Sequence, residues 1–296
     1  MAMSRMDAFF QGYNPYTGSA MPQPTRQGGV PADQPSAQGY PYQPQMPQPG
    51  MEPQVNPQEV LDPLYMAQSE LDKARAGIDK VRQYWGTVQR EVNSASTQTS
   101  RTGNDLYPAE NDTEETDHSR TGQWANSSLD QIERQLYNLR YDSSNPTYAV
   151  YEIKSQLASA QSYLSQVDSR RLPNPYRHQE AMRNMGDFSS QLYRIEMAQQ
   201  QLEQKLQGLQ TPISSARYDL NAVARDTEGV SVAYQARSAR GNLTTLSQQL
   251  QQIDQHLRYS EADLRTAETA ANSADQNMQA AYDEYQYSWR TSDRRV

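Results

Sequence analysis

Apolar residues recur at alternating steps of three and four along most of the chain beyond residue 62. In an α-helix this spacing gathers them on one narrow stripe, which is typical of a coiled-coil seam. A helix cannot bury such a stripe by itself, so each helix needs a partner from this chain or another. The residues expected in the coiled-coil core are Leu71, Ile78, Val81, Trp85, Leu157, Leu164, Leu192, Ile195, Leu202, Leu206, Leu243, Leu250, Leu257 and Leu264.

The composition favours a thin core over a wide globular interior. Hydrophobic residues make up 35% of the 296 residues, phenylalanine occurs three times, and the mean hydropathy is -0.98. A heptad seam needs apolar residues at only two positions in seven, so it suits a chain rich in Gln, Ser and Asn. We therefore predict an all-α fold, an elongated coiled-coil or helical-bundle rod with a disordered Pro/Gln-rich N-terminal arm.

Residues 1–56 form this low-complexity arm. Eleven of the seventeen prolines lie within residues 1–57, and the scattered apolar residues show neither helical nor strand periodicity. Two interpretations remain open, a solvated linker and an arm that docks on a partner, because PxxP spacings such as Pro41 to Pro44 favour polyproline II segments. The candidate docking residues of the arm are Phe9, Phe10, Tyr13, Tyr16, Tyr40 and Tyr42.

Breaks in the apolar spacing divide the rest of the chain. The first helix is expected to open at Asp62-Pro63, where Asp can cap the helix and Pro suits its first position. Thr211-Pro212 falls inside a long seam and indicates either a kinked helix or two helices meeting end to end. The expected segments are a coiled-coil helix at 57–96, a polar acidic linker at 97–123, a short helical hairpin at 124–172 and a long helical coiled-coil region at 173–296.

The last helix, expected after Gly241, carries acidic residues beside its seam. In a parallel pair of identical helices Asp263 would face Glu268, and like charges at these positions repel. We therefore expect this helix to pair antiparallel with a preceding one. The predicted partner is an arginine-bearing helix with Arg217, Arg225, Arg237 and Arg240.

An aromatic and basic tip ends the chain. Aromatic and arginine side chains often dominate protein interfaces, which makes the tip a candidate docking site. A fraying helix end, whose arginines favour the helix dipole, explains the same residues. Nearly all apolar residues of the helical middle lie on the seams, so we expect its outer faces to be polar. Aromatic residues are expected to concentrate in the arm and at this tip. The candidate docking residues of the tip are Tyr285, Tyr287, Trp289 and Arg290.

The sequence gives little support for catalysis. Cysteine is absent, and His118, His178 and His256 are isolated, without metal-ligand spacing to one another. Phosphate-binding loops, nucleophile elbows and His-Glu-x-x-His pairs are missing from the sequence. We therefore expect a protein that is not an enzyme and that uses no cofactor or metal.

The partners expected are other protein subunits, in a homo-oligomer or a hetero-complex. A formal net charge of -8 and a pI near 5.0 argue against direct binding to nucleic acid. Without a signal peptide or membrane span in the sequence, we expect a soluble protein in the cytoplasm or within an assembled particle. In composition the chain resembles bacteriophage scaffolding or internal virion proteins, which implies a structural or assembly role in a virion. The alternative is a cytosolic coiled-coil adaptor that presents its Pro-rich arm to a peptide-binding domain.

Overall fold

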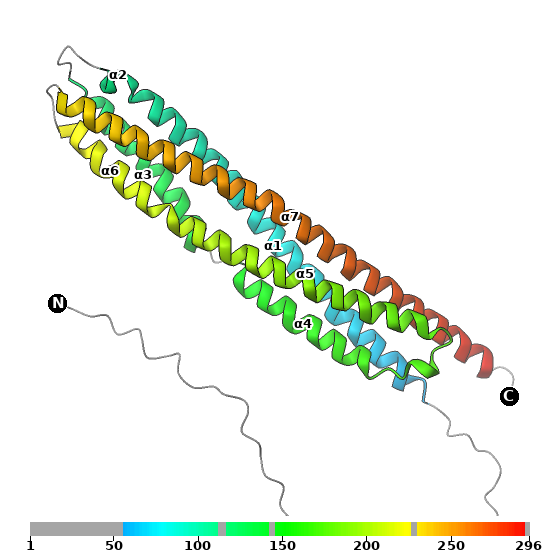
Figure 1. Ribbon diagram of the computed structural model, residues 1–296. Coiled ribbons are helices and arrows are strands. Elements are labelled where there is room, and N and C mark those ends of the chain that lie inside the picture. Colours follow the sequence, from blue (N-terminus) through cyan, green and yellow to red (C-terminus); the bar gives the residue numbers. More distant parts are fainter. Residues whose placement is uncertain (1–55, 112–116, 142–145, 226–229, 294–296) are drawn as a thin grey trace, which may run out of the picture. The chain divides into compact units, whose positions relative to one another are not determined.

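The computed structural model describes residues 56–111, 117–141, 146–225 and 230–293 (Figure 1). Within these ranges the chain forms helices and no strand, which confirms the predicted all-α fold. The N-terminal arm up to residue 55 falls outside them. The candidate docking residues that lie outside the described ranges are Phe9, Phe10, Tyr13, Tyr16, Tyr40 and Tyr42.

Two helices are much longer than the others. Helix α7 has 64 residues and helix α1 has 48. A short 3-10 helix, η1, lies in the connection between α4 and α5. In chain order the elements are α1 (Gln58–Asp105), α2 (Tyr107–Glu110), α3 (Ser119–Tyr141), α4 (Thr147–Ser165), η1 (Ser169–Arg171), α5 (Pro175–Gly208), α6 (Gln210–Arg225) and α7 (Val230–Asp293).

Helix α1 begins about one turn before the predicted opening at Asp62-Pro63. Asn56 Oδ1 accepts a hydrogen bond from Gln58 N at 3.1 Å, which stabilises the first turn, and Pro63 lies inside the helix. Pro63 lies beyond the first turn, where it removes one backbone hydrogen bond and crowds the carbonyl of Glu59, yet the helix continues through it. The predicted opening at Asp62-Pro63 is therefore wrong.

The polar linker predicted at 97–123 is also wrong for most of that range. Helix α1 continues to Asp105, and α2 and the start of α3 follow. Thr99 and Thr102 continue the three-and-four spacing, and both are fully buried. Their hydroxyl groups donate to main-chain carbonyls of the preceding turn at 2.7 and 2.9 Å. Threonine can occupy core positions here because its own helix satisfies its hydrogen bond.

Helices α1 and α7 lie side by side and run in opposite directions (Figure 1). Gln68 Nε2 donates to Gln279 Oε1 at 3.0 Å, and Gln89 Nε2, farther along α1, donates to Asp254 Oδ1 at 2.9 Å. Residue numbers therefore rise along α1 as they fall along α7. This is the antiparallel pairing that the acidic flanks of the last helix predicted.

The shorter helices pack beside this long pair. Helices α3 and α4 both pack along α1, and α5 and α6 both pack along α7. Helix α3 also packs on α6, and α4 packs on α5. Each long helix therefore packs against the other long helix and against two shorter ones.

The short hairpin predicted at 124–172 is wrong, because α3 and α4 run in the same direction. Tyr84 Oη of α1 donates to Leu139 O near the end of α3 at 3.0 Å, whereas Gly77 of α1 lies against Ile153 of α4. Both helices are thus antiparallel to α1 and follow one another along it. A proline turn sets where a helix ends but not the direction in which the chain leaves it.

Helices α5 and α6 also follow one another. Helix α5 ends at Gly208, α6 begins at Gln210, and Pro212 lies in the first turn of α6. The two-helix alternative for Thr211-Pro212 is therefore the one observed. Pro212 is tolerated in that turn because the first amides of a helix have no partner within it.

The acidic flanks of α7 contact arginines of α1 and α5. Arg82 of α1 lies 2.7 Å from Glu268, and Arg194 of α5 lies 3.7 Å from Asp263. Exposed ion pairs of this kind stabilise a fold only slightly, but they discriminate against wrong pairings. The arginines predicted as partners of these acids were instead Arg217, Arg225, Arg237 and Arg240, and that prediction is wrong.

Three of those four arginines have other partners. Arg217 of α6 lies 2.6 Å from Asp130 of α3. Arg237 and Arg240 belong to α7 itself, because α7 begins before Gly241, and both contact Glu110 of α2. The hydrogen bond from Arg240 is the main reason that the pKa of the Glu110 carboxyl lies below its ordinary value. These contacts hold α2 against α7.

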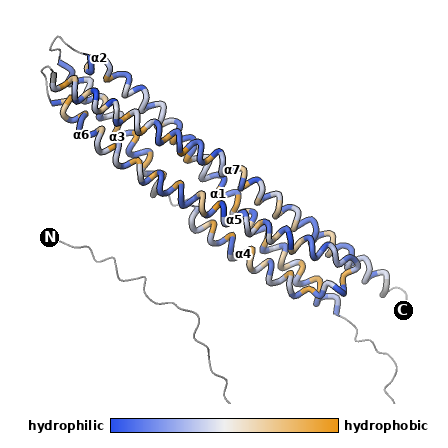
Figure 2. Tube along the Cα trace, viewed as in Figure 1, coloured by the Kyte–Doolittle hydropathy of each residue, from blue (hydrophilic) through white to orange (hydrophobic). Residues whose placement is uncertain are grey.

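The buried interior follows the predicted seams. All fourteen residues expected in the coiled-coil core are buried, and none is more than 6% exposed. Figure 2 shows hydrophobic residues recurring along every long helix rather than gathered in one segment. Among the polar contacts inside this core, Trp85 Nε1 of α1 donates to Gln199 Oε1 of α5 at 2.9 Å. Gln199 is itself only 2% exposed.

Candidate docking site at one end of the bundle

Three parts of the chain meet at the end of the bundle where α1 begins and α7 ends. Arg171 of η1 lies 2.6 Å from Glu59 of α1, and Arg177 of α5 lies 3.6 Å from Glu284 of α7. The turn between η1 and α5 is set by Asn174, whose side chain accepts a hydrogen bond from the second residue of α5 at 3.2 Å. This end is therefore built from segments that lie far apart in the sequence.

A groove of about 790 Å³ runs between α1 and α7 near this end. The hydrogen bond between Gln68 and Gln279 and the ion pair of Arg75 with Asp275, at 3.5 Å, join the two helices along it. Two aromatic side chains, one from each helix, line the groove beside charged groups. We call it the terminal groove, and its lining includes Tyr65, Ser69, Asp72, Lys73, Asp275 and Tyr282.

The predicted docking residues of the tip differ in exposure. Tyr287 is 72% exposed and Trp289 is 41% exposed, and Arg290 is exposed as well. Tyr285, by contrast, is only 7% exposed and belongs to the core, and burial raises the pKa of its hydroxyl. Its prediction as a docking anchor is wrong, because Tyr285 follows Ala281 at the three-and-four spacing of the seam.

The structure adds Tyr65 to this surface. Tyr65 lies near the start of α1, is 63% exposed and lines the terminal groove with Tyr282. No local pattern singles out Tyr65 in the sequence, since it becomes part of the site only when α1 packs against the last turns of α7. The antiparallel pairing of α1 with α7 is the feature from which the position of Tyr65 beside the end of α7 follows.

Exposed tyrosines also occur along the outer faces of the helices. The expectation of polar outer faces, with aromatics concentrated in the arm and at the tip, is therefore wrong for the helical middle. Each of these tyrosines lies away from the seam of its helix, so no neighbouring helix covers it. They are Tyr148, Tyr151, Tyr193, Tyr218, Tyr234 and Tyr259.

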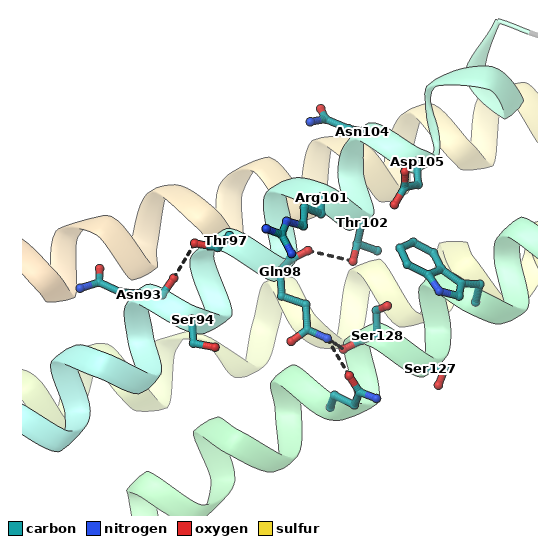
Figure 3. A pocket seen from close by; sticks show the side chains of 12 residues that line it. Asn93, Ser94, Thr97, Gln98, Arg101, Thr102, Asn104, Asp105, Ser127 and Ser128 are labelled. Atoms are coloured by element: carbon teal, nitrogen blue, oxygen red, sulfur yellow. Dashed lines mark hydrogen bonds between the residues drawn. The ribbon is translucent and has the colours of Figure 1, made fainter.

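A second groove, of about 980 Å³, lies between α1 and α3 (Figure 3). Most of its lining residues carry hydroxyl or carboxamide groups, and one aromatic residue, Trp124, also lines it. The sequence did not predict this α1–α3 groove, because residues 97–123 were expected to form a linker. Ala95, Thr99, Thr102 and Leu106 keep the three-and-four spacing, and that was the signal available in the sequence.

The histidines of α5 and α7 have structural contacts. His178 Nε2 lies 2.9 Å from Leu164 O, and His256 Nε2 lies 2.9 Å from Ala198 O. Each contact ties its helix to a neighbouring one. No three His, Cys, Asp or Glu side chains gather at a potential metal site within the described residues. Over the same part of the chain, no helix combines the length and the apolarity that crossing a bilayer requires.

No protein-family model, curated protein or solved structure matches this chain. Its function is therefore inferred from its own surfaces, of which the terminal groove combines aromatic anchors with charged groups of both signs. A groove of this kind, formed where two long helices end, suits a protein segment better than a small molecule.

Proposed function

We propose that this protein is a non-catalytic, coiled-coil component of a larger protein assembly, and that it joins this assembly through the bundle end that carries the terminal groove and the exposed tip of α7. The observation that carries the proposal is the gathering of exposed aromatic residues at the bundle end. Tyr65 and Trp289 are held there on two helices that other parts of the chain fix in place. Preordered aromatic anchors bind partners at low cost in conformational entropy.

A seven-residue repeat of contacts supports the coiled-coil part of the proposal. The residues of α1 that bond to α7 recur every seven positions, and they are Gln68, Arg75, Arg82, Gln89 and Ser96. Their partners on α7 include Asp275, Glu268, Asp254 and Ser247, which are also separated by multiples of seven. Contacts that repeat in this way are typical of flanking positions in a heptad.

The lengths of the helices support a spacer role. At about 1.5 Å per residue, the 64 residues of α7 extend about 96 Å. A helical rod of that length separates whatever binds at its two ends. The resemblance in composition to scaffolding and internal virion proteins makes a virus particle the kind of assembly that we propose.

Removing the two anchors should prevent assembly without unfolding the bundle. We expect the double variant Tyr65→Ser/Trp289→Ala to be incorporated at least about tenfold less than the natural protein, since hot-spot anchors are each worth more than ~1 kcal/mol. The measurement is the amount of full-length variant in assemblies purified from cells that naturally make the protein. Circular dichroism should show unchanged helix content, because neither side chain is buried.

The matched control is Tyr234→Ser/Tyr259→Ser, which removes two exposed tyrosines from α7 away from the groove. This variant should be incorporated like the natural protein. Equal incorporation of the Tyr65→Ser/Trp289→Ala variant and the control would contradict the proposed site. A natural chain that stays monomeric and joins no larger structure would contradict the proposed function.

A further inference from the structure

Short side chains from both helices line the α1–α3 groove. Ser94 and Thr97 of α1 and Ser127 and Ser128 of α3 leave space that longer side chains would fill (Figure 3). Gln98 spans the two helices, donating to Gln131 Oε1 at 2.8 Å. The groove is therefore held by one amide bridge and is otherwise accessible from solvent.

Uncharged hydrogen-bonding groups dominate the lining of this groove. Nine of its twelve side chains are hydroxyls or carboxamides. The Thr97 hydroxyl donates to a carbonyl of its own helix at 2.9 Å, so its oxygen still presents an acceptor to a ligand. Arg101 and Asp105 supply one charge of each sign, and neither forms an ion pair among the described residues. A ligand therefore meets both donors and acceptors, with no net charge.

Trp124 gives the groove one flat apolar surface. Its side chain is 49% exposed although its helix is packed on both α1 and α6. An indole ring carries a large apolar face and a single N–H donor. In the α1–α3 groove it is the only aromatic group among the lining residues.

This lining disfavours several classes of ligand. A nucleic acid or other polyanion needs clustered cations, and Arg101 is the only cation that lines the groove. A hydrophobic small molecule needs a mostly apolar cavity, and the lining is mostly polar. A ligand that fits is neutral, rich in hydroxyl groups and apolar on one face.

We propose that the α1–α3 groove binds a neutral oligosaccharide. A pyranose ring presents axial C–H groups on one face, which stack on an indole ring, and hydroxyl groups around its edge. With the Gln98 amide donating to Gln131, Gln98 Oε1 can still accept from a sugar hydroxyl and Gln131 Nε2 can still donate to one. From Asn93 to Asp105 the groove follows α1 for about 18 Å, at ~1.5 Å per residue, so it has room for several sugar rings.

Isothermal titration calorimetry of the full chain tests this assignment. The probes are maltohexaose, cellohexaose and the hexamer of N-acetylglucosamine, with a heparin hexasaccharide as the anionic comparison. We expect at least one neutral probe to bind and the heparin fragment not to bind. Trp124→Ala should weaken the binding by about tenfold or more, because the stacked ring is the main apolar contact.

Trp289→Ala is the matched control, because it removes another exposed tryptophan at the other end of the bundle. It should leave oligosaccharide binding unchanged, and Trp124→Phe should retain most of it. Circular dichroism of Trp124→Ala should show that the helices remain folded. The proposal is overturned if none of the neutral probes binds, if the heparin fragment binds more tightly than they do, or if Trp124→Ala binds like the natural chain.

Discussion

Gly122→Ala should destabilise the protein by about 1–3 kcal/mol, although alanine is ordinarily the better residue in a helix. Gly122 lies in the first turn of α3, and a Cβ added there would approach Ala224 N of α6 to 2.5 Å. Backbone atoms cannot move aside as a flexible side chain can, so α3 and α6 must separate. Thermal unfolding followed by circular dichroism should show a lower Tm, by roughly 2–4 °C for each kcal/mol.

Gly241→Ala is the control for this prediction. Gly241 lies inside α7, and an added Cβ there would meet nothing within 4 Å. Without a clash, alanine should stabilise the helix by about 0.5–1 kcal/mol. The two identical substitutions should therefore shift Tm in opposite directions, and a Gly122→Ala variant as stable as Gly241→Ala would contradict the close packing of α3 on α6.

Trp85→Ala should have the largest effect of any single substitution discussed, a loss of about 3–5 kcal/mol. Trp85 is 4% exposed, so its removal leaves a large cavity in the core. It also leaves Gln199 Oε1 without the donor that lies 2.9 Å away. Urea denaturation of the full chain measures the loss, and the control is Trp289→Ala, which removes an exposed indole and should change stability by less than ~0.5 kcal/mol.

A double-mutant cycle separates the cavity from the hydrogen bond. Trp85→Phe and Gln199→Leu should each cost about 1–3 kcal/mol, because each removes the buried hydrogen bond between Trp85 and Gln199. The double variant should be more stable than the sum of the two losses implies, since both partners are then removed. Additive losses would show that the contact between Trp85 and Gln199 contributes nothing to the core.

The seams were the most predictable part of the structure. Residues such as Leu71, Leu192 and Leu250 were assigned to the core from spacing alone, because a helical stripe of large apolar residues has few other uses. The spacing of large apolar residues did not predict the core positions that carry threonine instead of leucine. Thr99 and Thr102 are polar in a composition count, yet they are buried in α1 because their hydroxyls bond to its own carbonyls.

Which helix lies beside which was less predictable. A heptad repeat shows that a helix packs against a partner but does not identify the partner. The charged residues beside one seam are complementary to those of several other helices almost equally well. Arg82 and Arg217 looked alike in the sequence, yet one contacts α7 and the other contacts α3. The tip residues Tyr287 and Trp289 were predicted as docking residues because they are close together in the sequence. Tyr65 was not, because its place beside the tip depends on α1 packing against α7.

The helices fold back on one another within a single chain, with α1 antiparallel to α7. Ser96 Oγ and Ser247 Oγ lie 3.2 Å apart across this pair, and the natural chain contains no cysteine. Ser96→Cys/Ser247→Cys therefore places two thiols, the only ones in the protein, within reach of a disulfide. Thr97→Cys/Ser247→Cys is the control, because Thr97 is exposed on another face of α1.

The deciding measurement is oxidation of Ser96→Cys/Ser247→Cys at several protein concentrations, followed by intact mass spectrometry and a non-reducing gel. We expect a monomer that has lost two hydrogens, at a yield independent of dilution, and little of it in the control. Disulfide-linked dimers that fall away on dilution would show that the helices pair between chains. Thiols that stay reduced would show that α1 and α7 do not meet at this register, and either result would contradict the fold.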